Sequence, residues 1–163
     1  MLEAKERPDL RLLNPMTLAF VGDGVYEMLV REEIVRRYVS LPADRLHREA
    51  VKLVRASAQA AAVTAIAPLL TEEELAVFKR GRNANGVTPP RHSSAAEYRA
   101  ATGLEALFGW LYLSGDSGRL RRLFEAILEA GDEEIPAQTD GLDGMEDENS
   151  ARSDSQAETL SEN

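Results

Sequence analysis

Two apolar stretches with helical spacing each contain one acid. Residues 20–30 include Asp23, and residues 103–113 include Glu105. A carboxylate among core-forming residues is costly unless a partner, a proton or a cation compensates its charge. Glycines beside both acids leave room for a ligand. We therefore expect two buried helices that share one site, with a hard cation as the usual reason to build it. A buried salt bridge or a helix cap remains the alternative for each acid.

Helix start and stop signals divide most of the chain. Asn14-Pro15 predicts a helix start, and apolar residues then recur at helical spacing to about Tyr38. No stretch alternates with a period of two, so the predicted fold is all-α. Further helices are expected to open at Pro42, at Ser57 as an N-cap, at the capping boxes Thr71–Glu74 and Ser94–Glu97, and over residues 117–130. Gly, Asn and Pro residues predict a loop over 81–92.

Charge separates a domain from a tail. Residues 131–163 contain 11 Asp or Glu and one basic residue, whereas residues 1–130 contain 18 Lys or Arg and 17 Asp or Glu. The overall charge of −9 therefore describes neither part. We expect a near-neutral domain over 1–130 and an acidic, disordered tail over 131–163. The tail is hypothesised to be either a solvating segment or an autoinhibitory one that competes with an anionic ligand for the basic surface of the domain.

Several classes of site and location are disfavoured by the composition. The chain has no cysteine, which excludes disulfides and thiolate metal sites. Residues 1–10 are charged and lack the apolar core of a signal peptide, and no apolar run approaches the length of a membrane span. The expectation is a cytoplasmic protein with no membrane partner. Neither His47 nor His92 has a Ser or Cys partner that the sequence identifies.

Basic residues form two sets. The first follows one face of the second helix, where a solvated surface explains the residues as well as phosphate binding does. The second brackets the Gly/Asn/Pro loop, and small residues there let backbone N–H groups approach phosphate. The helix set is Arg45, Arg48, Lys52 and Arg55, and the loop set is Lys79, Arg80, Arg82 and Arg91 with Asn83 and Asn85. The loop set favours nucleic acid, and the helix set favours neither reading. From these sets, the candidate nucleic-acid-binding residues are Arg48, Lys52, Lys79, Arg80, Arg82, Asn83, Asn85 and Arg91.

Four motifs in order resemble the ribonuclease III catalytic domain, and especially its short bacterial form, mini-ribonuclease III. Phe20-Val-Gly-Asp-Gly-Val-Tyr-Glu27 is similar to the signature helix of the family, and Leu104-Glu-Ala-Leu-Phe-Gly109 to its second acidic motif. Lys79-Arg-Gly-Arg-Asn-Ala84 and Tyr98-Arg-Ala-Ala-Thr-Gly-Leu-Glu105 resemble the short form. The resemblance covers roughly residues 12–130.

The resemblance implies an all-helical, homodimeric endonuclease domain that cleaves double-stranded RNA with Mg²⁺ and leaves 5′-phosphate and 3′-hydroxyl ends. Asp23 and Glu105 match the catalytic, metal-binding acids of the family. For the short form, the implied substrate is precursor 23S ribosomal RNA, with a large-subunit ribosomal protein as a possible helper. A non-catalytic RNA-binding or ribosome-assembly module with the same fold is the alternative.

The chain departs from full-length ribonuclease III at two acidic positions. Ala19 stands four residues before Asp23 and Thr102 three residues before Glu105, where the longer enzymes usually carry Glu and Asp. Two carboxylates therefore remain per subunit, and Thr102 is a candidate replacement. Glu27, one helical turn after Asp23, is a second candidate for a supporting role, although an ion pair with Arg31 also explains it. The tail is not expected to form a double-stranded-RNA-binding domain.

Overall fold

Every regular element in the described part of the chain is helical, which confirms the all-α prediction. The computed structural model describes residues 9–84, 89 and 91–133. The elements are α1 (Pro15–Arg37), α2 (Ala43–Val54), α3 (Ala56–Ile66), the 3₁₀ helix η1 (Ala67–Leu69), α4 (Glu72–Arg82), α5 (Ala95–Ser114) and α6 (Ser117–Glu133).

The expected caps start three of these helices. Asn14 Oδ1 accepts a hydrogen bond from the Met16 N–H at 2.8 Å, with Pro15 at the first position of α1. Complete capping boxes open α4 at Thr71 and α5 at Ser94. Each box satisfies two backbone N–H groups through nearby side chains, so these helix ends need no tertiary partner. Pro42 precedes α2, as its sequence position predicts.

Three predicted helix boundaries are wrong. Helix α4 continues through Gly81 to Arg82, so the predicted loop over 81–92 begins two residues too early. Ser57 is not the N-cap of α3, because Arg55 has the extended backbone angle (ψ 150°) that ends α2 and starts α3. The last helix does not stop at residue 130 but continues to Glu133. An ion pair of 2.8 Å between Arg37 Nη1 and Asp132 Oδ1 links this extension to the end of α1.

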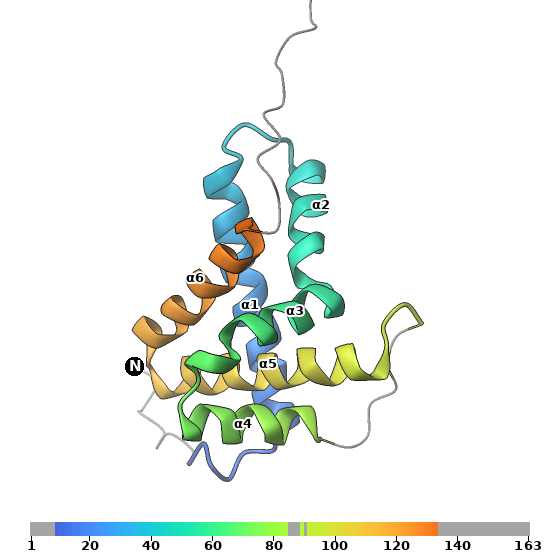
Figure 1. The fold of residues 1–163 in the computed structure, drawn as a ribbon. Coiled ribbons are helices and arrows are strands. Elements are labelled where there is room, and N and C mark those ends of the chain that lie inside the picture. The colour runs from blue at the N-terminus through green and yellow to red at the C-terminus, as the bar shows by residue number, and fades with distance from the viewer. Residues whose placement is uncertain (1–8, 85–88, 90, 134–163) are drawn as a thin grey trace, which may run out of the picture.

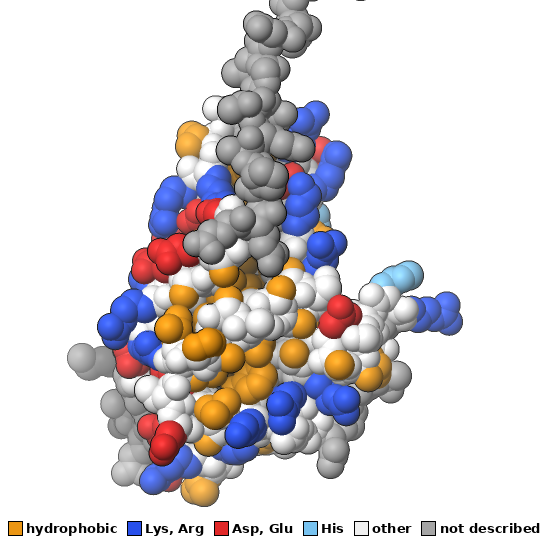
Figure 2. Space-filling view, in the orientation of Figure 1, with side chains coloured by type: hydrophobic (Ala, Val, Ile, Leu, Met, Phe, Trp, Pro, Cys, Tyr) orange, Lys and Arg blue, Asp and Glu red, His pale blue; other side chains and the backbone are white. Residues whose placement is uncertain are grey.

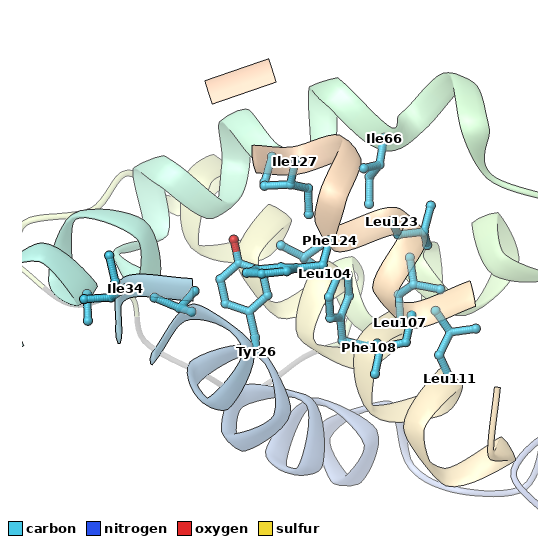
Figure 3. Close-up of a cluster of buried hydrophobic side chains, with 14 residues drawn as sticks. Tyr26, Ile34, Ile66, Leu104, Leu107, Phe108, Leu111, Leu123, Phe124 and Ile127 are labelled. Carbon is cyan, nitrogen blue, oxygen red and sulfur yellow. The ribbon is translucent and has the colours of Figure 1, made fainter. Parts of the chain in front are cut away.

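Helix α5 crosses the middle of the molecule, where it contacts α1, α3 and α4 (Figure 1). The principal core lies where α1, α3, α5 and α6 meet (Figure 3). Tyr26 of α1 packs edge-on against Phe108 of α5 and Phe124 of α6, with ring centroids 5.4 and 5.8 Å away. The core therefore fixes α1 and α5, the two helices that carry Asp23 and Glu105.

Glycines allow α1 and α5 to touch through their backbones. A Cβ atom on Gly22 would overlap the carbonyl oxygen of Glu105 and lie 2.8 Å from the backbone nitrogen of Gly109. A Cβ atom on Gly109 would in turn overlap the Leu18 carbonyl and lie 2.9 Å from the Gly22 nitrogen. Gly22 is thus required for close packing. At Gly24, by contrast, an added Cβ atom would have no neighbour within 4 Å in this chain, so packing within the chain does not require this glycine.

No single helix among residues 9–84 and 91–133 is long and apolar enough to cross a membrane. Only when α2 and the following α3–η1 segment are taken together, across a bend of 54°, do they have the length and apolar composition of a membrane span. Length and composition are weak grounds for a span, and α3 packs against α5 and α6.

We expect the substitution Gly22→Ala to lower the free energy of unfolding by roughly 3 kcal/mol, at the upper end of the cost of overpacking, because backbone atoms must move apart. Gly118→Ala is the matched control, since nothing lies within 4 Å of its added Cβ atom. That control should gain up to about 1 kcal/mol from helix propensity. Urea unfolding of both variants checks the pair, and equal stability would contradict the close-packed crossing.

Candidate active site

The α1–α5 crossing brings the two predicted acids together. Asp23 directly follows Gly22, the residue whose α-carbon faces the carbonyl of Glu105. The charge of Asp23 is close enough to raise the pKa of Glu105. Backbone contact between two helices, rather than long flexible side chains, therefore sets the position of the acid pair.

The two acids differ in burial, so the expectation of two buried acids is wrong for Asp23. Asp23 is exposed, whereas Glu105 is half-buried. The buried face of α1 contains Leu18, Gly22 and Tyr26, and one residue further along a helix turns the side chain by about 100°. Its apolar neighbour Phe20 is itself 82% exposed. Local apolar composition did not indicate which face of the helix is covered.

Glu105 has a pKa far above that of an ordinary carboxyl group. Burial and, second, the charge of Asp23 raise the pKa of Glu105 to about 7, while a hydrogen bond from the Gln59 side chain lowers it. Burial and the charge of Glu105 also raise the pKa of Tyr26. Near neutral pH the fold thus holds a carboxylate at an electrostatic disadvantage, which either a proton or a cation relieves.

The donor atoms at this site suit a hard cation. Asp23 and Glu105 offer carboxylate oxygens, and Gln59 adds an amide oxygen that is buried and has no hydrogen-bond partner. No group of three or more acids or histidines gathers within residues 9–84 and 91–133. One or two carboxylates suffice for Mg²⁺, which keeps several waters. The residues present therefore fit a cation held by two acids.

The two supporting candidates have other partners in the structure. Glu27 forms an ion pair with Arg31 at 3.3 Å, which is the alternative that its spacing suggested. Thr102 is buried, and its hydroxyl donates to the Tyr98 carbonyl of the same helix at 3.0 Å. Both contacts are ordinary within helices. Neither one demonstrates a contact with the acid pair.

The candidate RNA-binding residues separate into paired and accessible side chains. Arg48 and Lys52 pair with acids of their own helix, Asp44 at 2.8 Å and Glu49 at 2.7 Å. Arg80 donates to the Leu13 carbonyl at 2.7 Å and so anchors the segment before α1. These contacts favour a structural or solvated role for all three.

Lys79, Arg82 and Arg91 are exposed. Arg82 lies 5.9 Å from the ring centre of Phe78, and its Nε donates to Asn83 Oδ1 at 3.2 Å. Figure 2 shows Lys and Arg side chains along α4, below an apolar area. Basic residues at the end of α4 also complement the helix dipole. Asn85 lies outside the described residues.

Sequence reasoning missed Gln59, the polar side chain that lowers the pKa of Glu105. Gln59 is 3% exposed in α3, a helix made mostly of alanine. The signal was present as the one long polar residue on the buried face of that helix, which also contains Ala62 and Ile66.

Comparison with known proteins identifies the arrangement. The model of the ribonuclease III domain family matches residues 16–116. The chain belongs to the ribonuclease III family. Among its relatives, the mini-ribonuclease 3 of Symbiobacterium thermophilum is 48% identical over 118 residues, which cover 72% of this chain and 89% of that protein. The mini-ribonuclease 3 of a Thermoanaerobacter species is 44% identical over 121 residues, which cover 74% and 84%.

A solved structure supports the same fold. A crystal structure of a Fusobacterium nucleatum protein superposes with a TM-score of 0.67 at 28% sequence identity, and covers 73% of this chain and 96% of that one. The resemblance to mini-ribonuclease III is thus confirmed by the family match and the named relatives. The chain is an endoribonuclease, a hydrolase that acts on RNA.

The raised pKa of Glu105 predicts a pH-dependent stability in metal-free buffer. The folded state favours the protonated form of Glu105. The stability that this preference contributes is fully present below the ordinary pKa of 4.5 and is lost as the pH rises through about 7. Glu105→Gln should raise the free energy of unfolding at about pH 8 by up to about 3 kcal/mol, and hardly at all below about pH 4.5. Urea unfolding in EDTA across this range measures the difference.

Glu125→Gln, which alters an exposed acid of α6, is the control and should not show this pH dependence. A Glu105→Gln variant whose gain in stability is the same at both ends of the pH range would contradict the assignment.

Proposed function

We propose that the chain is a Mg²⁺-dependent endoribonuclease that cuts double-stranded RNA with Asp23 and Glu105. The observation that carries this proposal is the acid pair itself, which two helices in backbone contact hold together at an electrostatic cost. Such a cost is typical of functional sites. Membership in the ribonuclease III family and the mini-ribonuclease 3 relatives support the same reading.

The two acids have different tasks in this proposal. Asp23 is exposed on α1, so it faces an approaching phosphate, whereas half-buried Glu105 holds the cation from the interior. Mg²⁺, when bound, supplies an activated water and stabilises the charge that develops on the phosphate oxygens. Water would form the new bond to phosphorus and the 3′-oxygen of the preceding nucleotide would leave with a proton, so the products would carry 5′-phosphate and 3′-hydroxyl ends.

A second copy of the chain completes the proposed enzyme. Phe20 and Met28 are 82% and 67% exposed, and with Gly24 between them they form one stripe of α1 at four-residue steps. A large apolar stripe beside a charged site is typical of an interaction surface. An isologous dimer through this stripe places two acid pairs on one particle, one for each RNA strand.

The accessible basic residues indicate where the RNA duplex would bind. A-form RNA is recognised mainly through its phosphates and the 2′-hydroxyl groups of its minor groove. Lys79 and Arg82 at the end of α4 and Arg91 before α5 are exposed and suit phosphate contacts. Asn83 and Asn85 belong to the same proposal, whereas Arg48, Lys52 and Arg80 are weaker candidates because of their partners.

Resemblance to the short form extends the proposal to a biological substrate. We infer maturation of precursor 23S ribosomal RNA in the cytoplasm, with a large-subunit ribosomal protein as helper and with no role for a membrane. The catalytic domain is placed at residues 1–130, although α6 continues to Glu133. The acidic tail lies almost wholly outside the described residues, so its inhibitory role stays a hypothesis.

Asp23→Asn and Glu105→Gln should each lower the cleavage rate of duplex RNA in Mg²⁺ by roughly 1,000-fold, or about 4 kcal/mol, because each removes a charge that holds the cation. RNA binding in a salt-dependent gel shift should survive both changes. Gel analysis of cleavage products with and without EDTA measures the effect, and Glu125→Gln is the control. Full cleavage by either acid variant would refute the assignment.

Phe20→Lys should weaken the dimer by roughly 30-fold, or about 2 kcal/mol, the value of an interface hot spot. The reason is that a charge would replace the largest exposed side chain of the stripe. Sedimentation velocity over a range of concentrations measures the equilibrium. Val39→Lys, at a residue 85% exposed between α1 and α2, is the matched control. An unchanged dimer in Phe20→Lys would exclude this face.

A further inference from the structure

Gln59 is a buried polar side chain, and a hydrogen bond from its amide nitrogen holds it in position. It is 3% exposed, and its Nε2 donates to the Val54 carbonyl at 3.0 Å. Val54 is the last residue of α2, where carbonyl groups have no partner within their own helix. The amide of Gln59 therefore ties α3 to the end of α2, and its direction is not free.

The oxygen of the same amide is not satisfied. Gln59 Oε1 is the one buried side-chain nitrogen or oxygen without a hydrogen-bond partner in the part of the chain that the structure describes. An unpaired buried acceptor is costly, and the explanations for such a group in a folded protein are stored strain, a catalytic role, or a bound water or ion. Methionine has a similar size and would fill this space without an unpaired acceptor. The residue type thus calls for a functional reason.

The surroundings of Gln59 supply that reason. Helix α3 packs along α5, and the Gln59 side chain is close enough to Glu105 to lower the pKa of that acid, although the hydrogen bond that the amide makes in the ligand-free chain goes to Val54. An amide has two N–H donors, and Val54 uses one of them, which leaves the other for a carboxylate. Gln59 is buried and Asp23 is exposed, so we expect Gln59 to approach Glu105 from the interior of the protein.

We propose that Gln59 is a positioning residue of the acid pair: its amide holds Glu105, and its unpartnered Oε1 accepts a hydrogen bond from a water of the bound cation. This inference rests on the proposed function. A Mg²⁺ ion with two protein carboxylates retains waters whose hydrogens need acceptors, and Oε1 is an acceptor that lacks a donor. Partners beyond the direct ligands commonly orient a metal site in this way.

Two substitutions separate the roles of the amide. Gln59→Met removes the acceptor and both donors while keeping the size, and Gln59→Glu keeps acceptor oxygens. The full chain without RNA is titrated with Mg²⁺ while the melting midpoint is followed. Gln59→Met should weaken Mg²⁺ binding by about tenfold, as for other residues that orient metal ligands. Gln59→Glu should start from a lower midpoint without Mg²⁺, because it adds a negative charge, and should gain at least as much from Mg²⁺ as the wild type.

Cleavage kinetics add a readout that a purely structural role would not separate. Gln59 is buried and does not reach RNA, so Gln59→Met should lower kcat and leave KM for duplex RNA unchanged. Thr64→Val is the matched control on the same helix. It removes the 3.5 Å contact from an exposed hydroxyl to the Ala60 carbonyl and should alter neither Mg²⁺ binding nor kcat.

Three results would overturn the inference: wild-type Mg²⁺ affinity in Gln59→Met, equal losses of affinity in both variants, or a smaller Mg²⁺ gain in Gln59→Glu than in the wild type. The last result decides the matter even if Gln59→Met does not fold. Failure of the wild type to bind Mg²⁺ and to cleave RNA would instead overturn the proposed function, so the two failures are distinguishable.

Discussion

The backbone contact between α1 and α5 is the constraint on which the site depends. Gly22 and Gly109 replace side chains with direct contact between main chains, and any Cβ atom there would overlap a carbonyl group. Each glycine costs helix propensity, which is a reason not to find them inside helices unless packing requires them. Asp23 and Glu105 adjoin this contact in sequence. Their separation is therefore a property of the packed backbones.

The backbone contact also holds the two acids close together, which has an electrostatic cost. Asp23 opens to solvent, Glu105 lies half inside the core, and the charge of one disfavours the charge of the other. Gln59 and Tyr26 are buried polar groups that interact with Glu105: Gln59 lowers the pKa of that acid, and the charge of Glu105 raises the pKa of Tyr26. A core built for stability alone would have apolar groups at these positions. The protein thus gives up some stability in its ligand-free state to hold the acids ready.

Much of this fold was predictable because helix ends are local. The capping boxes at Thr71 and Ser94 and the cap at Asn14 depend on residues within a few positions, so sequence alone located them. The α2–α3 boundary was harder, because Arg55 makes no side-chain cap and the break is accompanied by a hydrogen bond from the Gln59 amide to the Val54 carbonyl, a contact that matches no common capping pattern. Burial was hardest, as it depends on which helix face meets α5. Asp23 and Phe20 have core-like neighbours in sequence, yet both are exposed.

The start of α5 has a consequence for how such a protein can vary. Ser94 and Glu97 close this end of the helix between themselves, and Asn83 ends α4 through the Lys79 carbonyl. Among the described residues, the hydrogen bonds that close these two helix ends come from the helix ends themselves and the residues next to them, Ala84 included, whose N–H donates to the Gly81 carbonyl at 3.2 Å. Glu105, two turns and more along α5, keeps its place by contact with α1. A change in the length or chemistry of the segment between α4 and α5 is therefore expected to leave the position of Glu105 unchanged.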